Sequence, residues 1–156
     1  MTLKLPALDP LSVTAIEKTG YPAPFNERVN GRAKRKLGDA CGLTQFGVNV
    51  TTLQPGSQSA LRHWHTLEDE FVYVLNGELV LITDEGEQLL RAGHCAGFPH
   101  GKRDGHHLIN RSNAPAQYLE VGSRIPGDVA DYSDEDITIV LGIDGHKFVH
   151  KDGSPF

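Results

Sequence analysis

Two histidines and a glutamate stand close together near the middle of the chain, at spacings that would let them share one ligand. His63 and His65 are two residues apart, so on an extended strand both imidazoles would leave the same face. Glu70 follows five residues after His65 and begins an apolar run, 71–75, that is typical of a second strand. Imidazole nitrogens and carboxylate oxygens together bind divalent transition metals, so this stretch predicts a metal site.

A further histidine source would complete the site, and the pair His106 and His107 offers one. Alternation along a strand favours His106, because it would share a face with Leu108 and Asn110, but His107 stays open as the alternative. Glu68 and Asp69 are alternative carboxylates to Glu70. They precede the expected strand, where acidic side chains are usually solvated, and Glu70 is therefore preferred.

Few other residues near this stretch could take part in chemistry. His100 stands between Pro99 and Gly101, where it could line the mouth of the site as a proton shuttle or lie exposed on a loop. The neighbouring pair Lys102-Arg103 could bind an anionic group of a substrate or remain on the surface.

Short strands separated by glycine, proline and asparagine fill the region around the histidines. The Asn76-Gly77 pair predicts a tight hairpin, because both residues tolerate positive φ angles. Val72, Val74 and Leu108 should face the site, and Phe71, Tyr73 and Trp64 the opposite side. The strands are expected at 43–53, 60–65, 70–75, 78–83, 87–91, 95–99, 106–111 and 116–123, with a last hairpin turning at Asp144-Gly145. This pattern favours an all-β antiparallel sandwich or barrel.

Length and composition bound the remaining possibilities. The chain has 156 residues, enough for one domain with an enclosed core, and a net charge of −5 that argues against nucleic acid as a partner. No apolar run is long enough to cross a membrane and no signal peptide is recognisable, so we expect a cytoplasmic protein. Cys41 and Cys95 are expected to be free, partly buried thiols.

The two ends of the chain differ from this central region. Prolines in the first thirty or so residues favour an extended arm, laid along the body or reaching to a neighbouring subunit. A basic run follows, which we expect to be a solvated loop, with an anion site as the alternative. An acidic segment after Pro126 is expected to be a solvated linker, and His146 and His150 are expected to have surface or packing roles. The basic run is Arg32, Lys34, Arg35 and Lys36, and the acids are Asp128, Asp131, Asp134, Glu135 and Asp136.

Two groups of residues in the central region resemble the two sequence motifs of the cupin superfamily. The first motif, a glycine, H-x-H, a glutamate and a glycine, is matched by Gly56, His63, His65, Glu70 and Gly77, with one residue more than usual before His63. The second motif ends in a histidine followed by an asparagine four positions later. It is matched by Gly93, Pro99, Gly101, His106 and Asn110, with a longer segment than usual between Gly101 and His106.

The resemblance implies a single domain, 1–156, whose core is a double-stranded β-helix, a small jelly-roll barrel, at 43–124. Residues 1–42 would form the N-terminal arm and 125–156 a C-terminal extension with a hairpin. The resemblance also implies one divalent transition metal, such as Zn, Mn, Fe or Ni, held by His63, His65, Glu70 and His106.

The resemblance leaves several functions open. We expect a metal-dependent enzyme acting on a small polar or anionic molecule, sugar-like or an oxo-acid, with isomerisation as the nominal reaction. The alternatives are a non-catalytic cupin that binds or senses a small ligand, and a metal-dependent dioxygenase or lyase. A homodimer is expected, because the arm and the C-terminal hairpin offer strands that could cover sheet edges.

Overall fold

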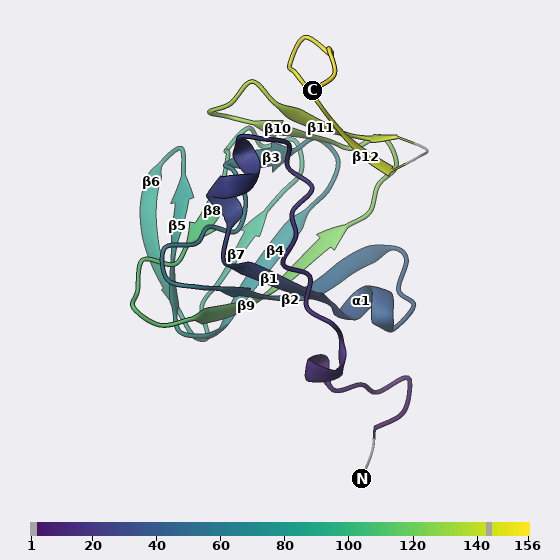
Figure 1. Ribbon diagram of the computed structural model, residues 1–156, viewed down its shortest axis with the longest axis vertical. Coiled ribbons are helices and arrows are strands. Elements are labelled where there is room, and N and C mark those ends of the chain that lie inside the picture. The colour runs from purple at the N-terminus through teal and green to yellow at the C-terminus, as the bar shows by residue number, and fades with distance from the viewer. Residues whose placement is uncertain (1–2, 143–144) are drawn as a thin grey trace.

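Three antiparallel sheets make up the body of the protein (Figure 1). The computed structural model describes residues 3–142 and 145–156. A five-stranded sheet has the order β1-β2-β9-β4-β7, a three-stranded sheet β6-β5-β8, and a four-stranded sheet β12-β11-β10-β3. The all-β jelly-roll expectation is therefore confirmed. The strands are β1 (Arg32–Lys36), β2 (Phe46–Leu53), β3 (His63–His65), β4 (Glu70–Asn76), β5 (Glu78–Thr83), β6 (Gly86–Arg91), β7 (Cys95–Phe98), β8 (His107–Ile109), β9 (Ala116–Ser123), β10 (Val129–Tyr132), β11 (Thr138–Gly142) and β12 (Gly145–Val149).

The main core lies between the five-stranded and three-stranded sheets. Strand β4 shows why it forms: Val72 and Val74 are buried, whereas Phe71 and Tyr73 between them are 40% exposed. The apolar residues of β5 and β9 on the inward side pack against the same centre, including Leu79. Each aliphatic side chain taken fully out of water in this way stabilises the fold by roughly 1.5–3 kcal/mol.

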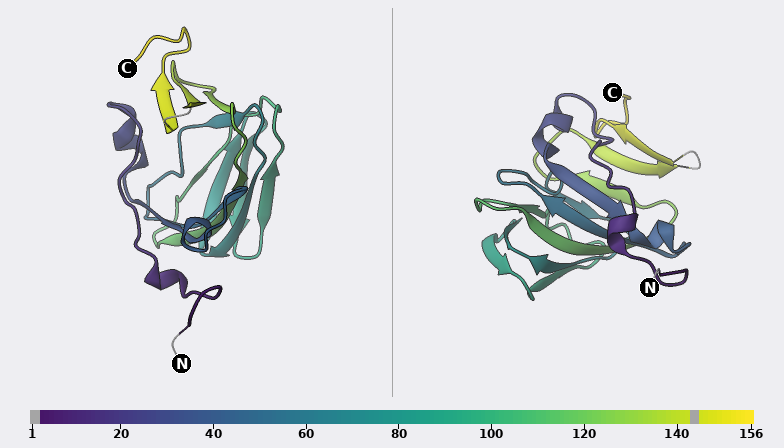
Figure 2. Two further views of the ribbon diagram at one scale, coloured as in Figure 1. Left: turned by 90° about the vertical axis from the view of Figure 1, so that its right-hand side faces the viewer. Right: turned by 60° about the horizontal axis from the view of Figure 1, so that its bottom comes forward.

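A second, smaller core joins the four-stranded sheet to the N-terminal arm. Leu61, Tyr132 and Ile137 form its centre, and Tyr21 and Phe148 pack against it from the two ends of the chain. Both views in Figure 2 place the C-terminal strands at one end of the barrel, beside the segment that leads into β1. This packing closes one end of the barrel next to the histidine strand β3.

Two turns fix the strands that flank the site. Gly77 has a φ of 76°, and a Cβ at that position would lie 2.9 Å from the Cβ of Ala116, so glycine is required in the β4–β5 hairpin. Asn110 is fully buried after β8 and donates hydrogen bonds to the carbonyls of Leu53 and Ala114, at 2.9 and 2.8 Å. Gly77 and Asn110, both residues of the cupin-like motifs, thus fix the turns that position β4 and β8 at the site.

Helix is scarce, and the arm is extended. The helical elements are η1 (Pro10–Ser12), η2 (Phe25–Val29) and α1 (Leu37–Ala40). None of the helices within the described ranges is long and apolar enough to cross a bilayer. Ile16 exchanges backbone hydrogen bonds of 2.8 and 3.0 Å with Lys34, so the arm lies along the edge strand of its own barrel.

The structure corrects three expectations. The basic run is not a solvated loop but strand β1, paired residue for residue with β2. Asp128 does not belong to a solvated linker, because its side chain is buried. Cys41 and Cys95 are free as expected, but both are exposed rather than partly buried. The expected turn at Asp144-Gly145 lies partly outside the described residues, although β11 and β12 do pair as a hairpin.

Candidate metal centre

Two strands and one loop bring the predicted residues to one place, where the three sheets meet. His63 and His65 lie at the two ends of β3, which pairs with β10, and Glu70 is the first residue of β4. His106 stands just before β8. Its backbone exchanges hydrogen bonds of 2.9 and 3.3 Å with His63, which sets the two imidazoles side by side.

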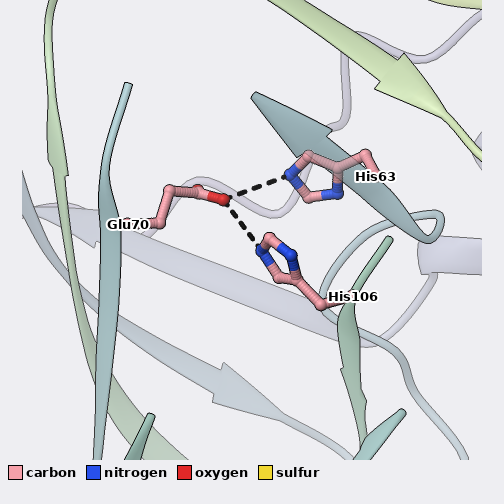
Figure 3. A group of neighbouring side chains, drawn as sticks. All are labelled: His63, Glu70 and His106. Carbon is pink, nitrogen blue, oxygen red and sulfur yellow. Dashed lines mark hydrogen bonds and ion pairs between the residues drawn. The ribbon is translucent and has the colours of Figure 1, made fainter. Parts of the chain in front are cut away.

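The three imidazoles converge on a single carboxylate oxygen. Oε2 of Glu70 lies 2.9 Å from Nε2 of His106, 3.5 Å from Nε2 of His65 and 3.6 Å from Nε2 of His63. Figure 3 shows Glu70 pointing between His63 and His106. These four side chains, the metal group hereafter, are the four that the sequence motifs indicate.

The opposite nitrogen of each ring is held by a hydrogen-bond acceptor. Nδ1 of His63 lies 2.8 Å from the carbonyl oxygen of Leu61, and Nδ1 of His106 lies 3.4 Å from that of Asp104. A carbonyl oxygen can only accept, so Nδ1 carries a hydrogen, and Nε2 is the nitrogen that would bind a metal in place of its present contact with Glu70. This is the tautomer that a metal-binding imidazole requires.

Asp128 orients the third imidazole, that of His65, a role that the sequence analysis did not predict. Its Oδ2 lies 2.6 Å from Nδ1 of His65, while Oδ1 accepts the backbone N–H of Leu67 at 2.7 Å. Burial alone would raise the pKa of Asp128, but these hydrogen bonds outweigh it and the pKa is lowered. The carboxylate is thus kept ionised next to His65. No local spacing separates Asp128 from the other acids of its segment.

The protonation states of the four side chains in the metal group suit the binding of a metal cation. Burial alone would raise the pKa of Glu70, but hydrogen bonds from His106 and His63 hold it well below its usual range. Burial lowers the pKa of His106, although its contact with Glu70 opposes this. Burial also acts to lower the pKa of His63, but there the nearby Glu70 carboxylate outweighs it and the pKa is raised. Near neutral pH the group therefore offers an ionised carboxylate that attracts positive charge.

Of the alternative ligands, His107 and Asp69 make their contacts away from Glu70. Nδ1 of His107 is 3.0 Å from the carbonyl oxygen of Ala60, and His106 rather than His107 faces Glu70. Asp69 and His100 form an ion pair of 2.7 Å in which the side chains are 66% and 59% exposed. Neither Asp69 nor His100 is among the residues that line the two cavities at the site.

The basic pair after Pro99 lies beside the site. Lys102 makes an ion pair of 3.2 Å with Asp104 and lines the smaller cavity, and the guanidinium of Arg103 lies 5.6 Å from the ring centre of Trp64. Trp64 also lines the smaller cavity, although the alternation along β3 predicts that it faces the opposite side.

Two cavities open onto the metal group. The larger, about 470 Å³, is lined by all four of its side chains, and the smaller, about 230 Å³, by three of them. Glu68 lines both, and its ligand atoms lie within 4.8 Å of those of His65 and Asp128. Phe98 stacks flat on His106, with ring centres 3.6 Å apart, and forms an apolar wall. A small molecule could therefore reach the metal group.

Comparison with known proteins agrees with this geometry. The family described as "Cupin domain" matches residues 49–122. The crystal structure of SPO2919 from Silicibacter pomeroyi, named a sugar phosphate isomerase from a cupin superfamily, is 46% identical, with a TM-score of 0.93 over 97% of this chain and 96% of that one. This chain belongs to the cupin superfamily. A second cupin-like structure, a putative sugar phosphate isomerase from Acidithiobacillus ferrooxidans, is 28% identical, with a TM-score of 0.72 over 80% of each chain.

More distant structures share the cupin fold alone. A predicted oxalate decarboxylase from Thermotoga maritima is 20% identical, with a TM-score of 0.62 over 76% of this cupin and 99% of that chain. No curated protein matches the sequence.

The residues of this cupin fit a divalent transition metal. Three imidazoles with inward Nε2 atoms and one ionised carboxylate form a set of intermediate softness, which suits Zn, Mn, Fe or Ni. A hard cation such as Ca²⁺ would instead need six to eight oxygen ligands. Affinity alone does not choose among the transition metals, because almost any nitrogen and oxygen site ranks them in the same order.

Proposed function

We propose that this cupin is a metal-dependent isomerase of a small phosphorylated or hydroxylated sugar-like molecule. The observation that carries the proposal is the convergence of three Nε2 atoms on one oxygen of Glu70, inside a cavity large enough for such a molecule. The name of the Silicibacter protein, which is 46% identical, supports the choice of reaction.

His63, His65, Glu70 and His106 would hold the metal. A divalent ion bound there supplies a Lewis acid that polarises a carbonyl or hydroxyl oxygen of the substrate. Around it, Asp128 fixes the ring of His65, and Phe98 and Val72 exclude water from one side of the cavity. The chain thus provides orientation and a partly dry environment for the reacting carbons.

Glu68 is the residue that we assign to proton transfer. Isomerisation of a hydroxy-carbonyl moves one proton between adjacent carbons and one between their two oxygens, and a single carboxylate can accept the carbon-bound proton from one carbon and return it to the next. Glu68 lines both cavities beside His65, and its Oε1 is held by the backbone N–H of Ile125 at 2.6 Å. The carboxylate is therefore fixed at the edge of the reaction space.

A metal-by-substrate screen tests the proposal. Wild-type protein loaded in turn with Mn, Fe, Ni and Zn is offered aldoses, ketoses and their phosphates, with His65→Ala as the blank. Interconversion by wild type alone is the expected result. Ligand-induced thermal stabilisation without any turnover would contradict the isomerase and select a non-catalytic binding protein.

We also propose that a second copy of the chain covers the outer face of the five-stranded sheet. Phe71, Tyr73 and Leu75 leave this face 40%, 40% and 45% exposed. Leu119 and Val121 of β9 stand next to them in register, as Cα partners of Tyr73 and Phe71. A contiguous apolar surface of this kind favours association, and the two-fold homodimer is the commonest arrangement.

A further inference from the structure

The wall of the larger cavity that faces the metal group is basic and comes from outside the region that matches the cupin family. Arg32, Lys34 and Lys36 alternate along β1 and all line this cavity. Arg35, between them, points the other way and donates to the carbonyl oxygen of Val13 in the arm. The family match begins at residue 49, so β1 lies outside the matched region.

The three inward cations differ in how they are neutralised. Lys34 forms an ion pair with Glu120, which also accepts a hydrogen bond of 2.9 Å from Asn49. Lys36 lies 3.9 Å from Asp39 at the exposed edge of the cavity. Arg32 donates to the carbonyl oxygen of Ser59, and within the described ranges no carboxylate forms an ion pair with it. Arg32 is therefore a half-buried cation that still lacks a counter-charge.

Two tyrosines connect this cation with the metal group. Tyr21 lines the same cavity, and its ring packs edge-on against that of Tyr132, with ring centres 5.7 Å apart. The ring of Tyr132 is in turn 5.5 Å from the ring of His63. A molecule that contacts Arg32 and Tyr21 would thus extend toward the metal group.

Arg32 and Glu70 lie in different rows of the five-stranded sheet. Glu70 has Gly122 as its neighbour in register on β9, and Gly122 in turn has Gly47 on β2. Arg32 instead pairs with Leu53 of β2, which pairs with Ala116 of β9. Both side chains line the same cavity from these different rows, so a ligand that contacts both needs different groups at its two ends.

We propose that Arg32, assisted by Lys34 and the hydroxyl of Tyr21, is the subsite for the phosphate group of a phosphate monoester. The proposal rests on the proposed function in one respect, that the other end of the ligand meets the metal group. A guanidinium binds phosphate through two parallel N–H···O bonds, and an anion here would supply the counter-charge that Arg32 lacks. The ligand class is therefore a sugar phosphate rather than a free sugar.

Calorimetry on metal-loaded protein tests the subsite, with hexose and pentose phosphates, the parent sugars and inorganic phosphate as probes. Arg32→Gln is compared with Arg35→Gln, which removes the same charge from the outward side of the same strand. We expect Arg32→Gln to weaken phosphate ester binding by about tenfold to a hundredfold, since that is the range for hydrogen bonds to a charged group. Arg35→Gln should bind as wild type does, and metal content should be unchanged in both.

Equal affinity of Arg32→Gln and wild type for the phosphate esters would overturn the subsite, as would equal affinity of wild type for sugars and their phosphates. If Arg32→Gln does not fold, Arg32→Lys and Lys34→Gln decide the matter, and unchanged affinity in both overturns the proposal.

The failure of the proposed function would look different. Loss of phosphate ester affinity in Arg32→Gln, with no isomerisation by any metal-loaded form, would support the subsite and reject the isomerase. Turnover of sugar phosphates that Arg32→Gln leaves unchanged would support the isomerase and reject the subsite.

Discussion

The two faces of the five-stranded sheet are built from the same strands but have opposite properties. On β4 the inward residues are Glu70, Val72 and Val74, and the outward ones are the exposed apolar residues of positions 71, 73 and 75. On β1 the inward face is basic, whereas the outward Arg35 only ties down the arm. We therefore propose that the polar inward face carries the chemistry and that the apolar outward face is a surface for association.

The largest effect on metal binding is expected at His106, in the loop before β8. His106→Ala should abolish metal binding at micromolar metal, because it removes the imidazole closest to Glu70. His107→Ala is the matched control, since this neighbouring ring contacts the carbonyl oxygen of Ala60 instead. Metal content per chain after dialysis measures the difference. Loss of metal from His107→Ala but not from His106→Ala would reverse the assignment.

Glu68→Gln should next separate catalysis from metal binding. Removal of the proton carrier is expected to lower kcat by about a hundredfold to ten-thousandfold, while metal content stays that of wild type. Glu85→Gln is a suitable control, because Glu85 lines only the smaller cavity. A kcat within a factor of a few of wild type would exclude Glu68 from proton transfer.

A smaller effect is expected from Asp128, which acts through His65. Asp128→Asn keeps the shape but weakens the hold on Nδ1, and such substitutions behind a metal ligand typically cost about tenfold to a hundredfold in metal affinity. Competition with a chelator measures the affinity, and Asp131→Asn in the same segment serves as the control. Equal affinities in the two variants would show that Asp128 only stabilises the loop around Leu67.

The outward face should affect assembly and leave the metal untouched. Tyr73→Lys places a charge in the exposed apolar patch, so we expect light scattering to show a shift from dimer toward monomer. Metal content should not change, because Tyr73 and Glu70 point to opposite sides of β4. A wild-type monomer at micromolar concentration would remove the dimer proposal.

Local sequence patterns predicted the strands in which one face is apolar. The bounds of β5 and β9 agree with the sequence prediction, and the spacing of two motifs indicated all four residues of the metal group. The rest depends on contacts between distant parts of the chain. Strand β1 has no apolar alternation, since its inward side faces a polar cavity, and only pairing with β2 makes it a strand.

Asp128 and His100 both show that local sequence patterns do not predict contacts between distant parts of the chain. Asp128 looks like any acid of its segment until β10 pairs with β3 and brings it to His65. The sequence left His100 either as a proton shuttle or exposed on a loop, and its ion pair with Asp69, from before β4, places it at the surface. In each case a residue far along the chain decides what the side chain does.

The central claim is that the four converging side chains bind one metal ion, and metal analysis combined with X-ray absorption on the purified protein tests it most directly. We predict about one divalent transition metal per chain, with a first shell dominated by imidazole nitrogens, as three histidines and one glutamate require. Wild-type protein that binds none of Mn, Fe, Ni and Zn when each is offered would contradict the account.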